Sequence, residues 1–176
     1  MSKNIYLKNS ISRSYFNKSL YTKDKIKLNK IINKILVSLD ENNDAIHSLS
    51  KKFNLNFRTS ELIKFNKFKS IILIGMGGSA LGAEAIYSFW KNKIKKKFFF
   101  LNNLDQFKIK EIKTNISLKD SLFIIISKSG NTLETLINVN LFKNIINNKN
   151  AIIITEKKTK RLNTFAKKKK MFLLEH

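Results

Sequence analysis

The 176-residue sequence contains no cysteine and no proline, and it has only five glycines, three arginines and two histidines. Without cysteine, the chain has neither disulfides nor a thiolate zinc site. His47 and His176 are far apart in the sequence, so we expect no metal site built on histidine. The N-terminal stretch MSKNIYLKNS is too polar for a secretory signal. The apolar stretch 71–90 contains clustered glycines and Glu84, which argue against a membrane span. We therefore expect a cytoplasmic protein that makes no membrane contact.

Lysine accounts for 32 of the 35 basic residues and gives most of the net charge of +23. Lysine, asparagine, isoleucine and phenylalanine are abundant while proline, glycine and arginine are scarce, which is typical of an AT-rich genome. Nucleic-acid sites favour arginine for bidentate contacts, and here the lysines are spread widely along the sequence. We therefore interpret them as a solvated surface. We expect no specific nucleic-acid partner, only weak non-specific binding at low salt.

Glycine is concentrated in two short stretches, although the chain has so little of it. Four of the five lie within residues 75–82, in the sequence IGMGGSALG, and the fifth, Gly130, lies in SKSGNTLET. A composition that disfavours glycine everywhere else indicates that these two stretches require a backbone without a side chain.

From residue 66 onward, short apolar runs alternate with segments of helical periodicity. Continuous apolar strands separated by single helices are typical of a parallel sheet covered on both faces. The pattern predicts an α/β fold with a doubly wound, parallel, five-stranded sheet and right-handed crossovers. The expected strands are 69–75, 97–103, 121–127, 151–155 and 171–175, and the expected helices are 79–92, 105–112, 132–146 and 158–168.

Residues 1–65 differ from the rest of the chain because they contain no glycine and no compact β-branched run. Apolar residues recur at helical spacing over 23–39, and 44–53 predicts a second short helix with Asp44 as its N-cap. We therefore expect two domains: a helical N-terminal segment (1–65) and a sheet domain (66–176).

The loop GMGGS joins the first predicted strand to the following helix. Ligands of such sheets bind at the carboxyl ends of the strands, where these loops lie. Gly77 and Gly78 permit close approach to the backbone, and the helix start favours an anion. Ser79 is predicted to cap the helix and to offer its hydroxyl. Read without a ligand, the same residues form a capped turn. The motif is neither a phosphate-binding GxxxxGK[ST] loop nor a regular GxGxxG motif.

The loop SKSGNT follows the third predicted strand and offers three hydroxyls, from Ser127, Ser129 and Thr132. Hydroxyls and amides at a helix start form a site for a phosphate monoester that needs no metal. We assign a role to the backbone of Lys128 and none to its side chain, and we expect Thr132 to cap the next helix. Glu134 fits the first helical turn, where the dipole favours acidic residues.

These two motifs together resemble the sugar isomerase (SIS) domain, and within it the phosphoglucose isomerase family. NNLDQ (102–106) and the closing MFLLEH are also similar to that family. The resemblance implies an enzyme that interconverts glucose 6-phosphate and fructose 6-phosphate without a cofactor and acts as a homodimer when full length. It implies that the sugar phosphate is held by the following residues: Gly77, Gly78, Ser79, Ser127, Lys128, Ser129 and Thr132.

The family's catalytic arginine, glutamate, histidine and late lysine have no counterpart among these residues, and the resemblance implies that they follow His176. We therefore expect the sequence to be an N-terminal fragment that is inactive alone. Two other interpretations stay open. One is a sugar-phosphate-sensing transcription regulator, with Asp44–Leu62 as a helix-turn-helix. The other is a stand-alone phosphosugar-binding module.

Overall fold

The computed structural model describes residues 18–39 and 45–175. The chain divides into two compact units, Met1–Asn54 and Leu55–His176. The predicted domain boundary at residue 65 lies within the second unit, because Phe65 is buried against the sheet together with Phe68.

The first unit contains the helix α1 (Lys18–Ser38) and the 3-10 helix η2 (Ala45–Leu49). The predicted helix over 23–39 is confirmed, and it begins five residues earlier than expected. Its apolar side chains, including Ile31 and Ile35, are exposed. The second predicted helix, 44–53, is wrong as an α-helix, since only a short 3-10 turn forms there. Its proposed N-cap, Asp44, lies outside the described residues.

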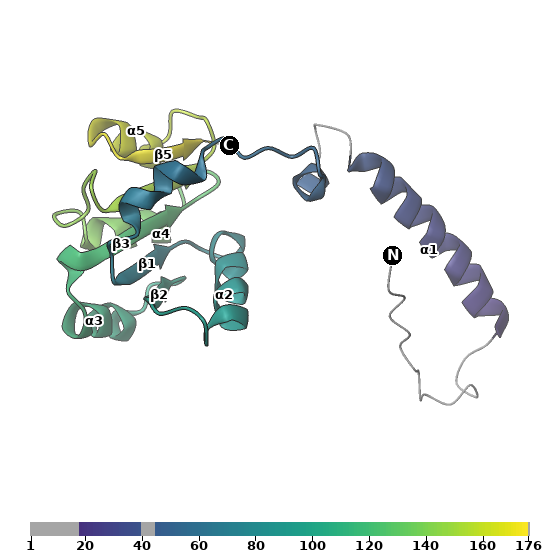
Figure 1. Ribbon diagram of the computed structural model, residues 1–176, viewed down its shortest axis with the longest axis horizontal. Helices are drawn as coiled ribbons and strands as arrows, with labels where there is room; N and C mark the ends of the chain where they lie inside the picture. Colours follow the sequence, from purple (N-terminus) through teal and green to yellow (C-terminus); the bar gives the residue numbers. More distant parts are fainter. Residues whose placement is uncertain (1–17, 40–44, 176) are drawn as a thin grey trace. The chain divides into compact units, whose positions relative to one another are not determined.

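The second unit is built on a sheet of five parallel strands, which confirms the predicted fold class (Figure 1). The strands lie in the order β2-β1-β3-β4-β5, so β1 sits between β2 and β3. All five predicted strands form, and their ends differ from the prediction by at most two residues. The strands are β1 (Ser70–Ile74), β2 (Lys97–Leu101), β3 (Ser121–Ile126), β4 (Ala151–Thr155) and β5 (Phe172–Glu175).

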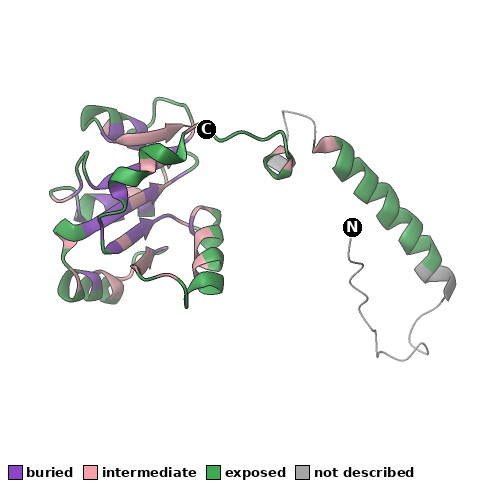
Figure 2. Ribbon diagram, in the orientation of Figure 1, coloured by how far each residue is buried: buried purple, intermediate pink, exposed green. Residues whose placement is uncertain are grey.

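Alternate residues of each strand point to opposite faces of the sheet. One face forms the larger core, in which Ile72, Phe123 and Ile153 are fully buried. This face is covered by three helices, α3 (Gln106–Asn115), α4 (Leu133–Leu141) and α5 (Arg161–Lys168), whose apolar residues belong to the same cluster. The three central strands, β1, β3 and β4, are the most buried part of the unit (Figure 2).

The opposite face is covered by α2 (Gly78–Trp90) and by the 3-10 helix η3 (Thr59–Phe65). Phe65 packs edge-on against Phe172 with ring centroids 5.6 Å apart. Tyr87 of α2 packs on Phe98 and Phe100 of β2 at 4.7 and 5.7 Å. The helix after β1 and the three later helices therefore lie on opposite faces of the sheet, as a doubly wound fold requires.

α4 and α5 are shorter than predicted by several residues. α4 ends at Leu141 instead of residue 146, because the chain turns at Phe142 so that Phe142 and Ile146 both reach the core. α5 begins at Arg161 instead of residue 158, after a turn closed by Lys158 and Lys160 amides.

The described part of the segment Asp44–Leu62, from residue 45 onward, does not form the two α-helices of a helix-turn-helix. Between residues 45 and 65 the described chain contains only η2 and η3, which are 3-10 helices of five and seven residues. Neither offers a recognition helix long enough to fill a DNA groove. The structure therefore does not support this part of the regulator interpretation.

Candidate functional site

The loops after β1 and β3 leave the sheet at neighbouring points. β1 pairs with β3 up to Ile74 and Ile125, so both motifs begin at the same edge. The first loop leads to α2 on one face, and the second leads to α4 on the other. This is the topological switch point of a doubly wound sheet, where such folds bind their ligands. The topology therefore brings together two motifs that lie some fifty residues apart in the sequence.

Gly75 and Gly77 are required by the geometry of the first loop. A Cβ atom at Gly75 would lie 3.1 Å from the carbonyl oxygen of Ile126 and 3.2 Å from that of Ser79. Gly77 has φ +50°, a conformation that side chains other than glycine's rarely adopt. The close pairing of the β1 and β3 ends and the turn into α2 therefore account for these two glycines without any ligand.

Gly77, and not Ser79, is the N-cap of α2, so the predicted capping role of Ser79 is wrong. The helix begins at Gly78, one residue earlier than expected, because the positive φ of Gly77 turns the chain into it. Ser79 is then the second helical residue and is half-buried at the mouth of the loop. A Cβ atom at Gly78 would meet nothing within 4 Å, so the fold itself does not explain this glycine.

Gly130 is required by the geometry of the second loop, as the scarcity of glycine elsewhere in the chain predicted. It has φ +66°, and its amide donates to the carbonyl of Ser127 at 3.2 Å, which closes a tight turn. A Cβ atom here would lie 3.0 Å from Thr155 Oγ1 and 3.1 Å from Lys160 Cβ. The loop is therefore pressed against the segment that follows β4.

The three hydroxyls predicted to hold phosphate do come together. Ser127 Oγ lies 3.0 Å from Thr132 Oγ1, which lies 3.4 Å from Ser129 Oγ. The Gly130 amide donates to Ser127 Oγ at 3.2 Å, and the Asn131 amide donates to Ser129 Oγ at 3.2 Å. Because both serine oxygens already accept these bonds, their protons are left to point at a neighbouring acceptor.

Thr132 occupies the N-cap position of α4, as expected, but its side chain makes no capping bond. Its hydroxyl is engaged with Ser127 and Ser129 instead. Glu134 lies in the first turn of α4, as predicted for an acidic residue there. The first-turn amides of α4 have no acceptor within the helix, so they stay available beside the hydroxyls.

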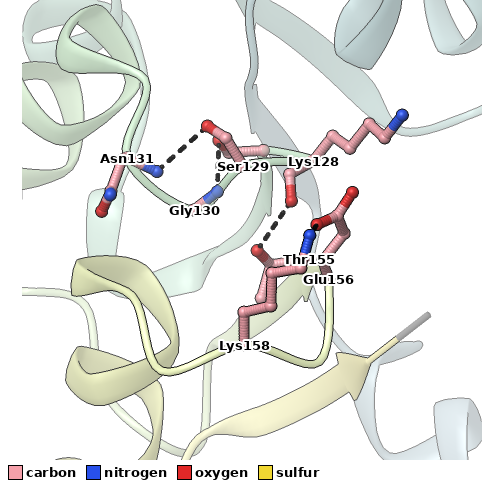
Figure 3. Close-up of polar contacts among 8 residues, drawn as sticks. Lys128, Ser129, Gly130, Asn131, Thr155, Glu156 and Lys158 are labelled. Atoms are coloured by element: carbon pink, nitrogen blue, oxygen red, sulfur yellow. Dashed lines mark hydrogen bonds and ion pairs between the residues drawn. The ribbon is translucent and has the colours of Figure 1, made fainter.

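The second loop is held by hydrogen bonds from the end of β4 and from the segment that follows it, made by residues that the sequence alone did not indicate (Figure 3). The Lys128 carbonyl accepts from the Glu156 amide at 3.2 Å and from Thr155 Oγ1 at 3.5 Å. Asn131 Oδ1 accepts from the Arg161 amide at 3.1 Å, while the Lys128 side chain points away from the loop in Figure 3. These hydrogen bonds could not be predicted from the sequence, because they form only when β4 lies next to β3 in the sheet.

The site thus has hydroxyls, helix-start amides and glycine backbone, which suit a small anion such as a phosphate monoester. Among residues 18–39 and 45–175, no three His, Asp or Glu side chains gather in a way that could hold a metal ion. Within the same described ranges, no helix is both long and apolar enough to cross a membrane.

Comparison with known proteins gives a consistent family. The model of the phosphoglucose isomerase family matches residues 24–174. A glucose-6-phosphate isomerase of Borrelia garinii subsp. bavariensis is 33% identical over 153 residues, covering 67% of this chain and 29% of that protein. One from Methanocaldococcus jannaschii is 42% identical over 86 residues, covering 49% of this chain and 21% of that protein.

Solved structures agree with this fold. The glucose-6-phosphate isomerase of Chlamydia trachomatis superposes with a TM-score of 0.55 at 29% identity, over 65% of this chain and 23% of that one. A hypothetical protein of Thermus thermophilus gives a TM-score of 0.68 at 19% identity, over 90% of this chain and 40% of that one, which shows a shared fold.

The chain spans less than a third of the length of the curated relatives described above. Within that span, the family match includes both loops, all five strands except the last residue of β5, and most of α1. The chain belongs to the phosphoglucose isomerase family.

Proposed function

We propose that residues 66–176 form a SIS-type domain that binds the phosphate of a sugar phosphate at the switch point between β1 and β3. The observation that carries the proposal is the hydroxyl cluster of Ser127, Ser129 and Thr132 at the start of α4. The Lys128 amide adds a further donor, and Gly77, Gly78 and Ser79 form the opposite side, where the sugar approaches the backbone.

The chemistry of the site favours a phosphate over a carboxylate. A phosphate monoester has three terminal oxygens, which match a cluster of several hydroxyls and amides better than the two oxygens of a carboxylate. The cluster has one free edge, because Ser129 is exposed and Thr132 is half-buried, while Ser127 is buried beneath them. A phosphate group can therefore reach the hydroxyls from solvent while the sugar stays near the glycines of the first loop.

For the whole protein, we propose aldose–ketose isomerisation of glucose 6-phosphate and fructose 6-phosphate. Relatives named glucose-6-phosphate isomerase support an isomerase of glucose 6-phosphate, and the family resemblance implies fructose 6-phosphate as its product. Such a reaction moves a proton between adjacent carbons, so it needs a general base and a group that stabilises the enediolate charge. The residues of this chain supply the phosphate anchor, which holds the sugar in place for that transfer. We further propose that the whole protein is a cytoplasmic homodimer.

Isothermal titration calorimetry with glucose 6-phosphate tests the phosphate site directly. We expect binding of glucose 6-phosphate and of fructose 6-phosphate by the 176-residue chain, and none of glucose, because the phosphate supplies the recognised group. Ser127→Ala should weaken binding about tenfold, the effect of losing one hydrogen bond to a charged group. Equal binding of glucose and glucose 6-phosphate would contradict the proposal, as would a Ser127→Ala variant that folds and binds with unchanged affinity.

A further inference from the structure

The lysines of the sheet unit gather at the edge opposite the phosphate site. The segments that lead into the strands form what we call the amino edge, which comprises residues 64–69, 91–97, 113–120, 143–150 and 167–171. These segments hold sixteen of the 24 basic residues of the unit and one of its eight acidic residues, Asp120. The remaining residues of the unit carry eight basic and seven acidic side chains, so they are close to neutral.

A genome-wide codon bias does not produce this asymmetry. Such a bias acts on all surface positions, whereas here the excess charge lies almost entirely at one edge of one sheet. The lysines are spread along the sequence, as the sequence analysis found, but the parallel topology brings five of the segments that carry them side by side. The folded unit is therefore electrically polar, with a cationic amino edge and a near-neutral remainder.

The helix dipole accounts for only part of this charge. Helices α2 to α5 end at the amino edge, where cations are favoured near the last turn. Lys169 Nζ donates to the Lys143 carbonyl at 3.0 Å, and Lys96 Nζ donates to the Asn66 carbonyl at 2.6 Å. These two side chains have structural roles. The runs 93–97 and 167–170 continue past the helix ends, and Lys67 and Lys95 are exposed there.

Two adjoining grooves mark the centre of the amino edge. One, of about 600 Å³, is lined by Lys67, Lys69 and Lys95–Lys97. The other, of about 670 Å³, is lined by Lys67, Lys119 and Lys149 together with several asparagines. Both grooves share Phe68 and Asp120. A continuous anionic chain that follows them would pass lysines from the segments before β1, β2, β3 and β4.

Exposed aromatic side chains lie beside the same edge. α2 ends with Phe89 and Trp90, which are 80% and 44% exposed, immediately before the lysine-rich stretch 91–97. Lys93 Nζ lies 4.6 Å from the centre of the Trp90 ring. Exposed aromatic rings on the same cationic edge are groups on which unpaired bases can stack while the phosphates follow the charge.

We propose that the amino edge binds single-stranded nucleic acid without sequence preference. Lysine suits this role because it contacts phosphate as a point charge, whereas reading base edges favours the arginine fork that this edge lacks. A concave, asparagine-lined pair of grooves suits a flexible strand better than a flat membrane surface. The surface lies at the far edge of the sheet from the phosphate site, so the two can be occupied together.

Fluorescence anisotropy with a labelled 20-nucleotide oligo-uridine RNA tests this on the 176-residue chain. If about four phosphates are contacted, log affinity should fall with log salt at a slope of about −3, an approximately 50-fold loss between 50 and 200 mM salt. The triple variant K67E/K95E/K119E, in which exposed lysines of both grooves are reversed, should bind at least about tenfold more weakly and reduce that slope by about 2.

A matched control distinguishes the edge from the net charge. K108E/K110E/K157E changes the total charge equally but lies outside the amino edge, and it should alter affinity less than about threefold. If K67E/K95E/K119E fails to fold, the neutral triple variant K67Q/K95Q/K119Q is used in its place. Equal weakening by both triple variants would overturn the proposal, as would absence of RNA binding at 50 mM salt. Tighter binding to vesicles containing phosphatidylserine than to the RNA, lost in K67E/K95E/K119E, would also overturn it in favour of a membrane.

Discussion

The two loops at the switch point differ in how much of their shape the fold itself secures. The second loop is held by hydroxyl-to-hydroxyl contacts, by Asn131 to the Arg161 amide, and by the close approach of Gly130 to Thr155. The first loop has two glycines that the fold requires, Gly75 and Gly77, and two others, Gly78 and Gly82, that meet nothing within 4 Å.

This difference indicates what each loop would contribute to the proposed sugar-phosphate site. The second loop presents hydroxyls already in position, so the proposed binding of a phosphate would require little further ordering of the loop. A Cβ atom at Gly78 would meet open space at the start of α2, and in the proposed site the sugar phosphate fills this space. We interpret the second loop as the preformed anchor and the first as the open side of the site.

The largest effect is expected at Gly130. Gly130→Ala should lower the free energy of unfolding by about 2–4 kcal/mol, since it combines left-handed backbone strain with overpacking against Thr155 and Lys160. Urea denaturation followed by circular dichroism measures it. A loss below 1 kcal/mol would show that the second loop relaxes easily and is not the braced element described here.

Gly75→Ala should have the next largest effect on stability. Its Cβ atom meets backbone and Cβ atoms of Ile126 and Ser79, which shift less readily than the end of a side chain. Its φ carries no left-handed strain, so the expected loss is about 1–3 kcal/mol from overpacking alone. The same denaturation measurement applies. A loss larger than that of Gly130→Ala would reverse the ranking of the two loops.

Ser127→Ala separates anchoring from stability. The buried Ser127 hydroxyl accepts from the Gly130 amide, so its removal should cost about 1 kcal/mol in unfolding free energy as well as weakening sugar-phosphate binding. Ser129→Ala, at an exposed position, is the matched variant and should weaken binding with a smaller stability loss. If both variants lose stability equally, Ser127 is not the internal support of the cluster.

Gly78→Ala and Gly82→Ala are a matched pair for the open side of the site. Both positions lie in α2 with free space around a new Cβ atom, so each change should stabilise the fold by about 0.4–1 kcal/mol. Only Gly78→Ala should weaken glucose 6-phosphate binding in calorimetry. Equal affinity of both variants and the unchanged chain would show that the sugar does not approach Gly78.

The smallest expected effect lies outside both loops, at Glu175 on the edge strand β5. Hydrogen bonds from Asn163 at 2.5 Å and from Lys167 at 3.2 Å lower the pKa of its carboxyl below the ordinary value of 4.5. Its stabilising contribution is therefore present above that value and is lost as the pH falls through the lowered pKa. In thermal unfolding measured from pH 6 to 3, the melting temperature of Glu175→Gln should fall slightly less steeply with decreasing pH than that of the unchanged chain. An identical pH profile would mean that exposure screens the contact fully.

The fold could be predicted because continuous apolar strands separated by helices leave few alternatives. The strands that were clearest in the sequence, such as 121–127 and 151–155, formed with ends that differ by at most one residue. The ends of α4 and α5 could not be predicted, because the burial of Ile146 and the turn at Lys158 depend on tertiary neighbours. Residues 45–53 form only the 3-10 turn Ala45–Leu49, because so short a segment does not sustain an α-helix.

The candidate site was predictable in composition but not in its internal contacts. Glycine scarcity singled out Gly77 and Gly130, both of which have positive φ. The N-cap of α2 was misassigned to Ser79, since a serine is the commoner cap and the turn that makes Gly77 the cap is visible only in three dimensions. The charged amino edge was not recognised in the sequence, although the predicted parallel sheet already places the segments before its strands at one edge.

The strand order also determines when the site can exist during folding. Ser70 pairs with Ser121, 51 residues later, whereas it pairs with Lys97 after 27 residues and Ile152 pairs with Phe172 after 20. Closing the longest of these loops costs only about 0.6 kcal/mol more than closing one half as long. However, the pairing of β1 with β3 spans β2 and α3, so it is the least local of these strand pairings. Both proposed binding loops follow the ends of that one strand pair, β1 and β3. The proposed phosphate site should therefore form late in folding and in a single step, and a nascent or partly unfolded chain that keeps its helices should not bind a sugar phosphate.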